Sequence, residues 1–146
     1  MSSLPLVYTI LALIAYTTSF WYLFMHLMSK RAPNHWFIGI VLGLGLCLHA
    51  AVLYNDMLLP MGINYNVFNL MSFTSGLMLL LSVLFSTYRP VIALNLIGIP
   101  VAATGLILGH SFSGLNLFVE NNSLGLDIHI LLSLSAYAVL LMATIH

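Results

Sequence analysis

Five apolar segments, each about twenty residues long, constrain this chain more than any other feature of its sequence. A helix needs about 20 apolar residues to cross roughly 30 Å of hydrocarbon, at a rise of about 1.5 Å per residue. We predict spans at residues 4–28, 36–59, 67–87, 91–109 and 126–146. The sequence therefore predicts an all-α fold, a polytopic transmembrane helical bundle of about five spanning helices that forms a single domain.

Composition excludes several classes of function. Hydrophobic residues make up 62% of the chain and charged residues 4%, against roughly 25% charged residues in soluble domains. Three basic and three acidic side chains give a net charge of zero, so a basic surface for nucleic acid is not available. Cys47 is the single cysteine, which excludes an intrachain disulfide and a paired-cysteine metal site.

The few basic residues predict the orientation of the bundle. Lys30 and Arg31 fall between the first two spans, and Arg89 falls between the third and the fourth. All three share one side of the predicted topology, and loops on the cytoplasmic side are enriched in lysine and arginine. We therefore expect the amino terminus to lie outside.

Small and hydroxyl residues predict how the spans pack, because they allow helix backbones to approach closely within a membrane. Such residues recur at helical spacing in the first four spans. They are Ala12, Ala15 and Ser19 in the first, Gly39 and Gly43 as a GxxxG pair in the second, Ser72, Ser75, Ser82 and Ser86 in the third, and Gly98, Ala102, Gly105 and Gly109 in the fourth. These stripes favour a compact bundle and indicate no particular function.

Histidines are the main candidates for chemistry, because ionisable side chains within spans are costly and usually face the bundle interior. His49, His110 and His129 fall in the predicted outer half of the membrane, whereas His26, His35 and His146 fall near the cytoplasmic boundary, where interfacial anchors are more common. A neutral imidazole nitrogen is the axial ligand that haem iron takes from proteins. The alternative is that each histidine only hydrogen-bonds a neighbouring helix.

The fifth segment carries polar groups at helical spacing. His129, Ser133 and Tyr137 recur at positions i, i+4 and i+8 of an otherwise leucine-rich run. We expect this face to point into the bundle. Asp127, at the start of the segment, is expected to cap the helix or to accept a hydrogen bond from a histidine ring.

The same segment resembles a known family. Residues 126–138 read as His-x3-Ser-x3-Tyr-Ala from His129 onward and resemble the signature helix of the cytochrome c assembly superfamily (CcsA, CcmC and HemX-like proteins). Residues 47–51 (CLHAA) and 68–72 (FNLMS) are also similar to its YpjD-like branch, which lies in the bacterial inner (cytoplasmic) membrane. Members typically have about eight membrane helices, so we expect these 146 residues to be the amino-terminal part of a longer protein.

The resemblance implies haem handling in cytochrome c assembly. It implies His49 and His129 as haem-iron ligands, with His110 and Tyr137 as further candidates. The implied partners are other cytochrome c assembly membrane proteins or apocytochrome c. The only tryptophans are Trp21 and Trp36, so the tryptophan-rich motif that presents haem in better-studied relatives is absent, which favours a haem-binding, accessory or regulatory role.

Other classes of function remain open from the residues alone. No carboxylate pair, GxSxG, HExxH or P-loop motif occurs, so hydrolytic catalysis has no support. One alternative is a transport or ion-pathway component whose inward polar residues line a route. The other is a non-catalytic scaffold subunit in which each histidine is structural.

Overall fold

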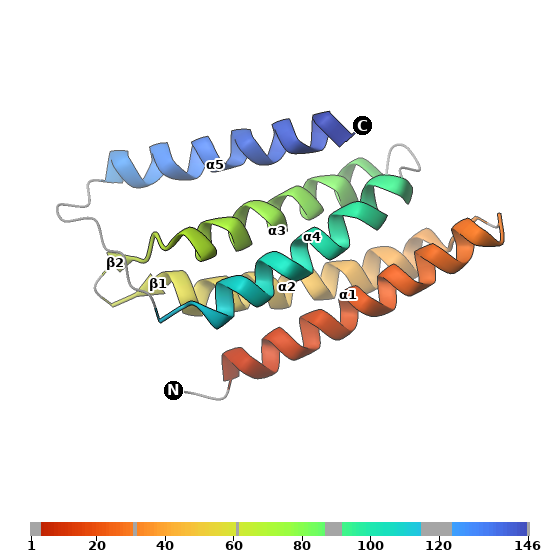
Figure 1. The fold of residues 1–146 in the computed structure, drawn as a ribbon, viewed down its shortest axis with the longest axis horizontal. Coiled ribbons are helices and arrows are strands. Elements are labelled where there is room, and N and C mark those ends of the chain that lie inside the picture. Colours follow the sequence, from red (N-terminus) through yellow and green to blue (C-terminus); the bar gives the residue numbers. More distant parts are fainter. Residues whose placement is uncertain (1–3, 31, 61, 87–91, 115–123, 146) are drawn as a thin grey trace.

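The computed structural model describes residues 4–30, 32–60, 62–86, 92–114 and 124–145, which form five helices and one short hairpin (Figure 1). The elements are α1 (Leu4–Met28), α2 (His35–Met57), β1 (Leu58–Leu59), β2 (Gly62–Ile63), α3 (Val67–Ser86), α4 (Ile92–Ser111) and α5 (Leu124–Ile145). The predicted all-α bundle is confirmed, and the helix ends differ from the predicted spans by two residues at most. The β1–β2 hairpin is an addition that the sequence did not predict.

Four of the helices are long and apolar enough to cross a membrane. They are α1, α2, α3 and the part of α4 from Leu94 to Ser111. In α5 the qualifying apolar stretch is shorter, Gly125–Leu141, within the part of the chain that the structure describes. The lengths of the four long apolar helices match the thickness of a bilayer's hydrocarbon core and identify the chain as a membrane protein.

Local side-chain chemistry sets the connection between α1 and α2. Lys30, just after α1, has a φ of 52°, the left-handed conformation in which many helices end. Asn34 precedes α2, and its side-chain oxygen accepts the backbone N–H groups of Trp36 and Phe37. This N-cap satisfies donors that the first turn of a helix leaves without partners.

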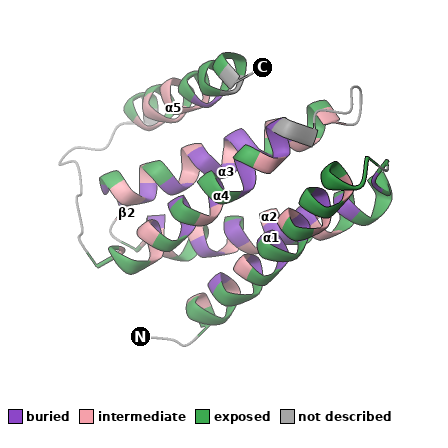
Figure 2. Ribbon diagram, turned by 45° about the vertical axis from the view of Figure 1, so that its right-hand side comes forward, coloured by how far each residue is buried: buried purple, intermediate pink, exposed green. Residues whose placement is uncertain are grey.

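The helices pack in a consistent order across the bundle. α1 packs on α2 and α4, and α3 packs on α4, on α2 and on α5. α3 therefore lies between α2 and α5, as Figure 1 shows. Buried residues line the faces where helices meet, and exposed residues cover the outside of the bundle (Figure 2).

α3 and α4 approach closely through small residues, as predicted. A Cβ atom built on Gly109 would lie 2.8 Å from the Cβ atom of Ser72, and one built on Gly98 would lie 3.3 Å from a methyl group of Leu79. Ala102 between them is fully buried. The small size of the residues on this face of α4 thus allows the two backbones to approach closely.

The predicted packing role of the Gly39 and Gly43 pair in α2 is wrong. A Cβ atom built on either glycine would meet no other atom within 4 Å. The glycine of α2 that contacts α1 is Gly45, where an added Cβ atom would lie 2.9 Å from a ring carbon of Tyr16. The contact requires a small residue opposite the large Tyr16 ring, a requirement that a GxxxG pattern does not encode.

The main core is shared by α1 to α4, and α5 lies at its margin. Buried core residues include Tyr16, Leu42, Leu79 and Leu106. α5 contributes Ala138, which packs with Met78 and Leu94 in a smaller cluster. Within the described residues, most of the α5 circumference is therefore left for lipid or another partner.

Candidate functional site

His49 joins three helices within the bundle. The residue is 1% exposed. Its Nδ1 atom lies 3.0 Å from the hydroxyl oxygen of Tyr16 in α1, and its Nε2 atom lies 2.9 Å from Oγ of Ser72 in α3. Both ring nitrogens therefore have hydrogen-bond partners, which avoids the cost of a buried polar group without one.

An apolar groove of about 430 Å³ lies beside His49, between α2 and α3. Gly76 of α3 faces the imidazole, and a Cβ atom built there would lie 3.1 Å from the His49 Cε1 atom. Apart from His49 and Cys47, the residues that line the groove are glycine, alanine, leucine, valine and phenylalanine. The groove thus combines one imidazole with an otherwise apolar wall.

A second histidine is paired with a carboxylate near one end of the bundle. Nδ1 of His110 in α4 lies 3.0 Å from Oδ2 of Asp56 in α2. An ionised carboxylate only accepts hydrogen bonds, so we assign the proton to Nδ1. In the neutral ring Nε2 then carries a lone pair, the arrangement that a carboxylate imposes on metal-binding histidines. The sequence placed His110 in the predicted outer half of the membrane and gave no signal for its pairing with Asp56.

Tyr65 and Asp127 connect α5 to the segment before α3, at the same end. The Tyr65 hydroxyl donates a hydrogen bond to Oδ1 of Asp127 in the first turn of α5. Burial of the phenol, and then the neighbouring carboxylate, raise the pKa of Tyr65 to about 12. The partner of Asp127 is thus a tyrosine, whereas a helix cap or a bond to histidine was predicted.

Buried asparagines fix the segment before α3 to the end of α4. The Asn66 side chain donates to the Phe112 carbonyl at 2.7 Å, and the Asn64 side chain donates to the Ser113 carbonyl at 3.4 Å. Asn69 donates to the Asp56 carbonyl at 3.2 Å. Asn69 thus connects α3 to the end of α2 beside Asp56.

His129 and His49 do not form a pair. α3 lies between α2 and α5, and His129 is an exposed residue of α5 that does not line the groove beside His49. The Ser133 hydroxyl donates to the His129 carbonyl and so serves its own helix. The structure therefore places the two predicted ligands at separate positions, and the predicted inward face of α5 is exposed at His129 and Tyr137.

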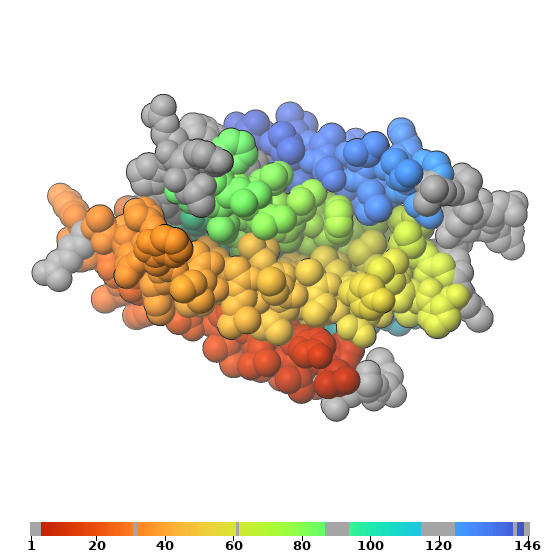
Figure 3. All heavy atoms as spheres, turned by 180° about the vertical axis from the view of Figure 1, so that it is seen from behind, coloured from red at the N-terminus to blue at the C-terminus, as the bar shows by residue number. Residues whose placement is uncertain are grey.

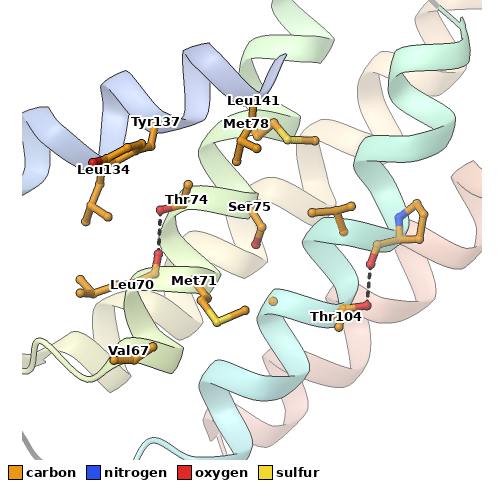
Figure 4. A pocket seen from close by; sticks show the side chains of 13 residues that line it. Val67, Leu70, Met71, Thr74, Ser75, Met78, Thr104, Leu134, Tyr137 and Leu141 are labelled. Carbon is orange, nitrogen blue, oxygen red and sulfur yellow. Dashed lines mark hydrogen bonds between the residues drawn. The ribbon is translucent and has the colours of Figure 1, made fainter. Parts of the chain in front are cut away.

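Tyr137 lines a groove of about 610 Å³ between α3, α4 and α5 (Figure 4). Thr74 and Thr104 also line it, and their hydroxyl groups donate to carbonyls of their own helices, those of Leu70 and Pro100. These threonines present their methyl groups rather than free donors. The groove is consequently apolar, with the Tyr137 ring at its edge.

The boundary histidines lie apart from these sites. His35 is an exposed residue at the start of α2. His26 lies near the end of α1, and its Nδ1 atom is 2.9 Å from the Tyr22 carbonyl oxygen. His146 is outside the described residues.

Sequence reasoning missed Tyr16 and the role of Ser72 beside His49. Tyr16 follows Ala12 by four residues and precedes Ser19 by three, so the spacing of the small residues on α1 already placed it on the packing face. Ser72 was recognised as a packing residue only. A search for hydroxyl groups on the faces that meet an intramembrane histidine would have identified both.

The fold and these hydrogen bonds define a membrane helical bundle with interhelical histidine contacts. Within the described part of the chain, no three or more His, Cys, Asp or Glu residues are grouped so that they could hold a metal ion. A comparison with models of protein families, with curated proteins and with solved structures finds no match to this chain.

Proposed function

We propose that the chain is a membrane haem-handling protein of cytochrome c assembly, in which single histidines contact haem at separate positions. The observation that carries the proposal is the imidazole of His49 beside the apolar groove between α2 and α3. The resemblance of residues 126–138 to the signature helix of that superfamily supports it.

The surroundings of His49 fit a ligand histidine on one condition. In the tautomer with the proton on Nδ1, the Tyr16 oxygen accepts from Nδ1–H, which orients the ring and leaves the lone pair on Nε2. The Ser72 hydroxyl then donates to Nε2 and must turn away before that nitrogen binds a metal. Hydroxyls in helices readily bond the carbonyl four residues earlier, as Thr74 and Ser86 already do in α3.

His110 fits the role of a ligand without that change, because Asp56 occupies Nδ1 only. His129 is accessible on α5. Neither of the two grooves described is lined by more than one of these histidines, so they fit three single-histidine contacts and not a bis-histidine site. Haem, when bound, supplies the iron chemistry; the chain supplies oriented imidazoles and an apolar wall that excludes water.

A scaffold role is the second candidate, and the satisfaction of both His49 nitrogens favours it. An imidazole that bonds Tyr16 and Ser72 stabilises the contact of α1, α2 and α3 without any ligand. In that case haem binding would be absent, and replacement of His49 would lower only the stability of the bundle.

One experiment separates the two candidates. Detergent-purified protein is titrated with haem, and oxidised and reduced absorption spectra are recorded for the wild type and for His49→Ala, His110→Ala and His129→Ala. His35→Ala is the matched control, because His35 is exposed and lines neither of the two grooves described above. We expect a saturable Soret band that shifts or weakens in at least His49→Ala or His110→Ala and is unchanged in the control. A folded wild type with no saturable band, or an equal effect of every substitution, would support the scaffold role.

A further inference from the structure

Another groove lies at the end of the bundle opposite to the Asp56 and His110 pair. It has a volume of about 580 Å³ and lies where the end of α1 meets the start of α2, beside Lys30 and far from Asp56. In the space-filling view of Figure 3 these two segments, in orange, meet at one end of the molecule. Along α1 the groove runs from Thr17 to His26, about 14 Å by the helical rise.

Aromatic rings form its wall at the Lys30 end. The Tyr22 ring lies 4.1 Å from the His26 ring and 4.9 Å from the Phe37 ring, measured between centroids. The Tyr22 hydroxyl accepts the backbone N–H of Asn34 at 3.2 Å, which fixes this ring to the α1–α2 connection. The wall therefore offers flat faces held at a defined position, suited to a planar ring.

The hydrogen-bonding capacity that remains in the groove is limited and specific. The Tyr22 carbonyl oxygen only accepts, so Nδ1 of His26 donates and Nε2 of the neutral ring is an acceptor. Trp21 adds an indole N–H, a donor. The described part of the chain supplies no partner to the Trp21 N–H or to Nε2 of His26.

The far part of the groove offers no comparable group. The hydroxyl of Thr17 donates to the carbonyls of Leu13 and Ile14, and that of Thr18 donates to Ile14. Their methyl groups are left to line the groove. It therefore has an aromatic end with one acceptor and one donor, and an apolar end that leads toward the middle of the membrane.

We propose that this groove binds the hydroquinone head group of a membrane isoprenoid quinol. The ring stacks beside Tyr22, one hydroxyl donates to Nε2 of His26, and an oxygen of the ring accepts from the Trp21 indole. The isoprenoid chain follows the groove past Thr17 and Thr18 into the hydrocarbon. The proposal concerns binding alone and is independent of haem.

The test uses Trp21 as a fluorescent reporter. Trp36 is 84% exposed and lines none of this groove, so Trp36→Phe leaves one emitting tryptophan. The full chain with this substitution is placed in phosphatidylcholine nanodiscs and titrated with a short-chain ubiquinol kept reduced. The titration is repeated with its dimethyl ether, which cannot donate. Two further variants carry His26→Phe or His35→Phe, the second as the matched control at a neighbouring exposed histidine.

We expect saturable quenching by the quinol, with an apparent Kd about tenfold weaker for the dimethyl ether and for His26→Phe, the loss of about one hydrogen bond. His35→Phe should bind like its parent. Quenching that rises linearly and equally in all variants would show that Trp21 meets only ligand dissolved in the lipid, and would overturn the proposal. Equal affinity for the quinol and its dimethyl ether would also overturn the proposal. This comparison uses the chain in which His26 is intact, so it does not depend on whether His26→Phe folds. No haem is present, so either result leaves the haem proposal untouched.

Discussion

The Tyr16 hydroxyl oxygen lies 3.0 Å from Nδ1 of His49, so α1 and α2 are connected by a hydrogen bond at the centre of their apolar contact. The two ring planes meet edge to face, with centroids 6.1 Å apart. Gly45 makes this geometry possible, because any larger residue there would collide with the Tyr16 ring. The position of His49 therefore depends on a residue of another helix.

Tyr16→Phe tests that dependence. The substitution keeps the ring and removes only the hydroxyl, so Nδ1 of His49 loses its partner in an apolar environment. We expect the free energy of unfolding to fall by about 0.5–2 kcal/mol, the range for interhelical hydrogen bonds in membranes. The measurement is denaturation in mixed micelles by increasing amounts of sodium dodecyl sulfate. Thr17→Val, which removes an exposed hydroxyl bonded within α1, should cost clearly less; an equal cost would contradict the role of Tyr16.

The Asp56 and His110 pair predicts an energetic coupling between α2 and α4. In a double-mutant cycle, Asp56→Asn and His110→Gln should couple by about 1 kcal/mol, because the first removes the carboxylate and the second the imidazole from the same hydrogen bond. The same denaturation assay measures it. Asp56→Asn combined with Ser86→Ala at the other end of the bundle serves as the control and should be additive. Additivity for Asp56 and His110 as well would mean that the pair contributes nothing.

Two glycines should respond to alanine with opposite signs. Gly109→Ala places a methyl group 2.8 Å from the Cβ atom of Ser72 and 3.3 Å from the Phe68 carbonyl oxygen, so we expect a loss of about 1–3 kcal/mol. At Gly39→Ala the methyl group meets nothing within 4 Å, and the better helix propensity of alanine should raise stability by up to about 0.5–1 kcal/mol. Thermal unfolding of both variants in one detergent measures these changes. A loss of stability in Gly39→Ala would show that this glycine has a packing partner.

Tyr65 predicts a loss of stability in alkali. Its pKa is raised to about 12 in the folded chain, against 10.0 ordinarily, so the unfolded chain releases this proton first. The contribution of the protonated Tyr65 hydroxyl to the free energy of unfolding is fully present below about pH 10 and is lost as the pH rises through about 12. Ultraviolet absorption of tyrosinate, as the difference between the wild type and Tyr65→Phe, measures the pKa directly. A difference spectrum with a midpoint near 10 would contradict the buried bond to Asp127.

The helices were predictable because their apolar length and their charged or proline-containing connections are local properties of the sequence. Stripes of small residues also located the contact of α3 with α4, where Gly109 meets Ser72. The β1–β2 hairpin was missed because Leu58 and Leu59 continue the hydrophobicity of α2. Gly62, which begins β2 opposite Leu59, has a φ of 127°, a conformation open to glycine.

The partners of the histidines were not predictable, because periodicity gives the face of a helix and not its neighbour. His49 and His129 were both expected to face the bundle interior, yet α3 lies between their helices. The pairing of His110 with Asp56 spans fifty-four positions. Only the order of helices in space shows which imidazole has a carboxylate beside it and which has hydroxyls.

The short connection capped by Asn34 also orders events during synthesis. Chains emerge with the amino terminus first, so α1 and α2 are complete, and able to enter the membrane as a helical hairpin, while α3 is still being made. Of the two hydrogen-bond partners of His49, that hairpin contains only Tyr16, because Ser72 belongs to α3. Until α3 is made, the chain can therefore offer the imidazole of His49 only one of the two partners that it has in the complete bundle.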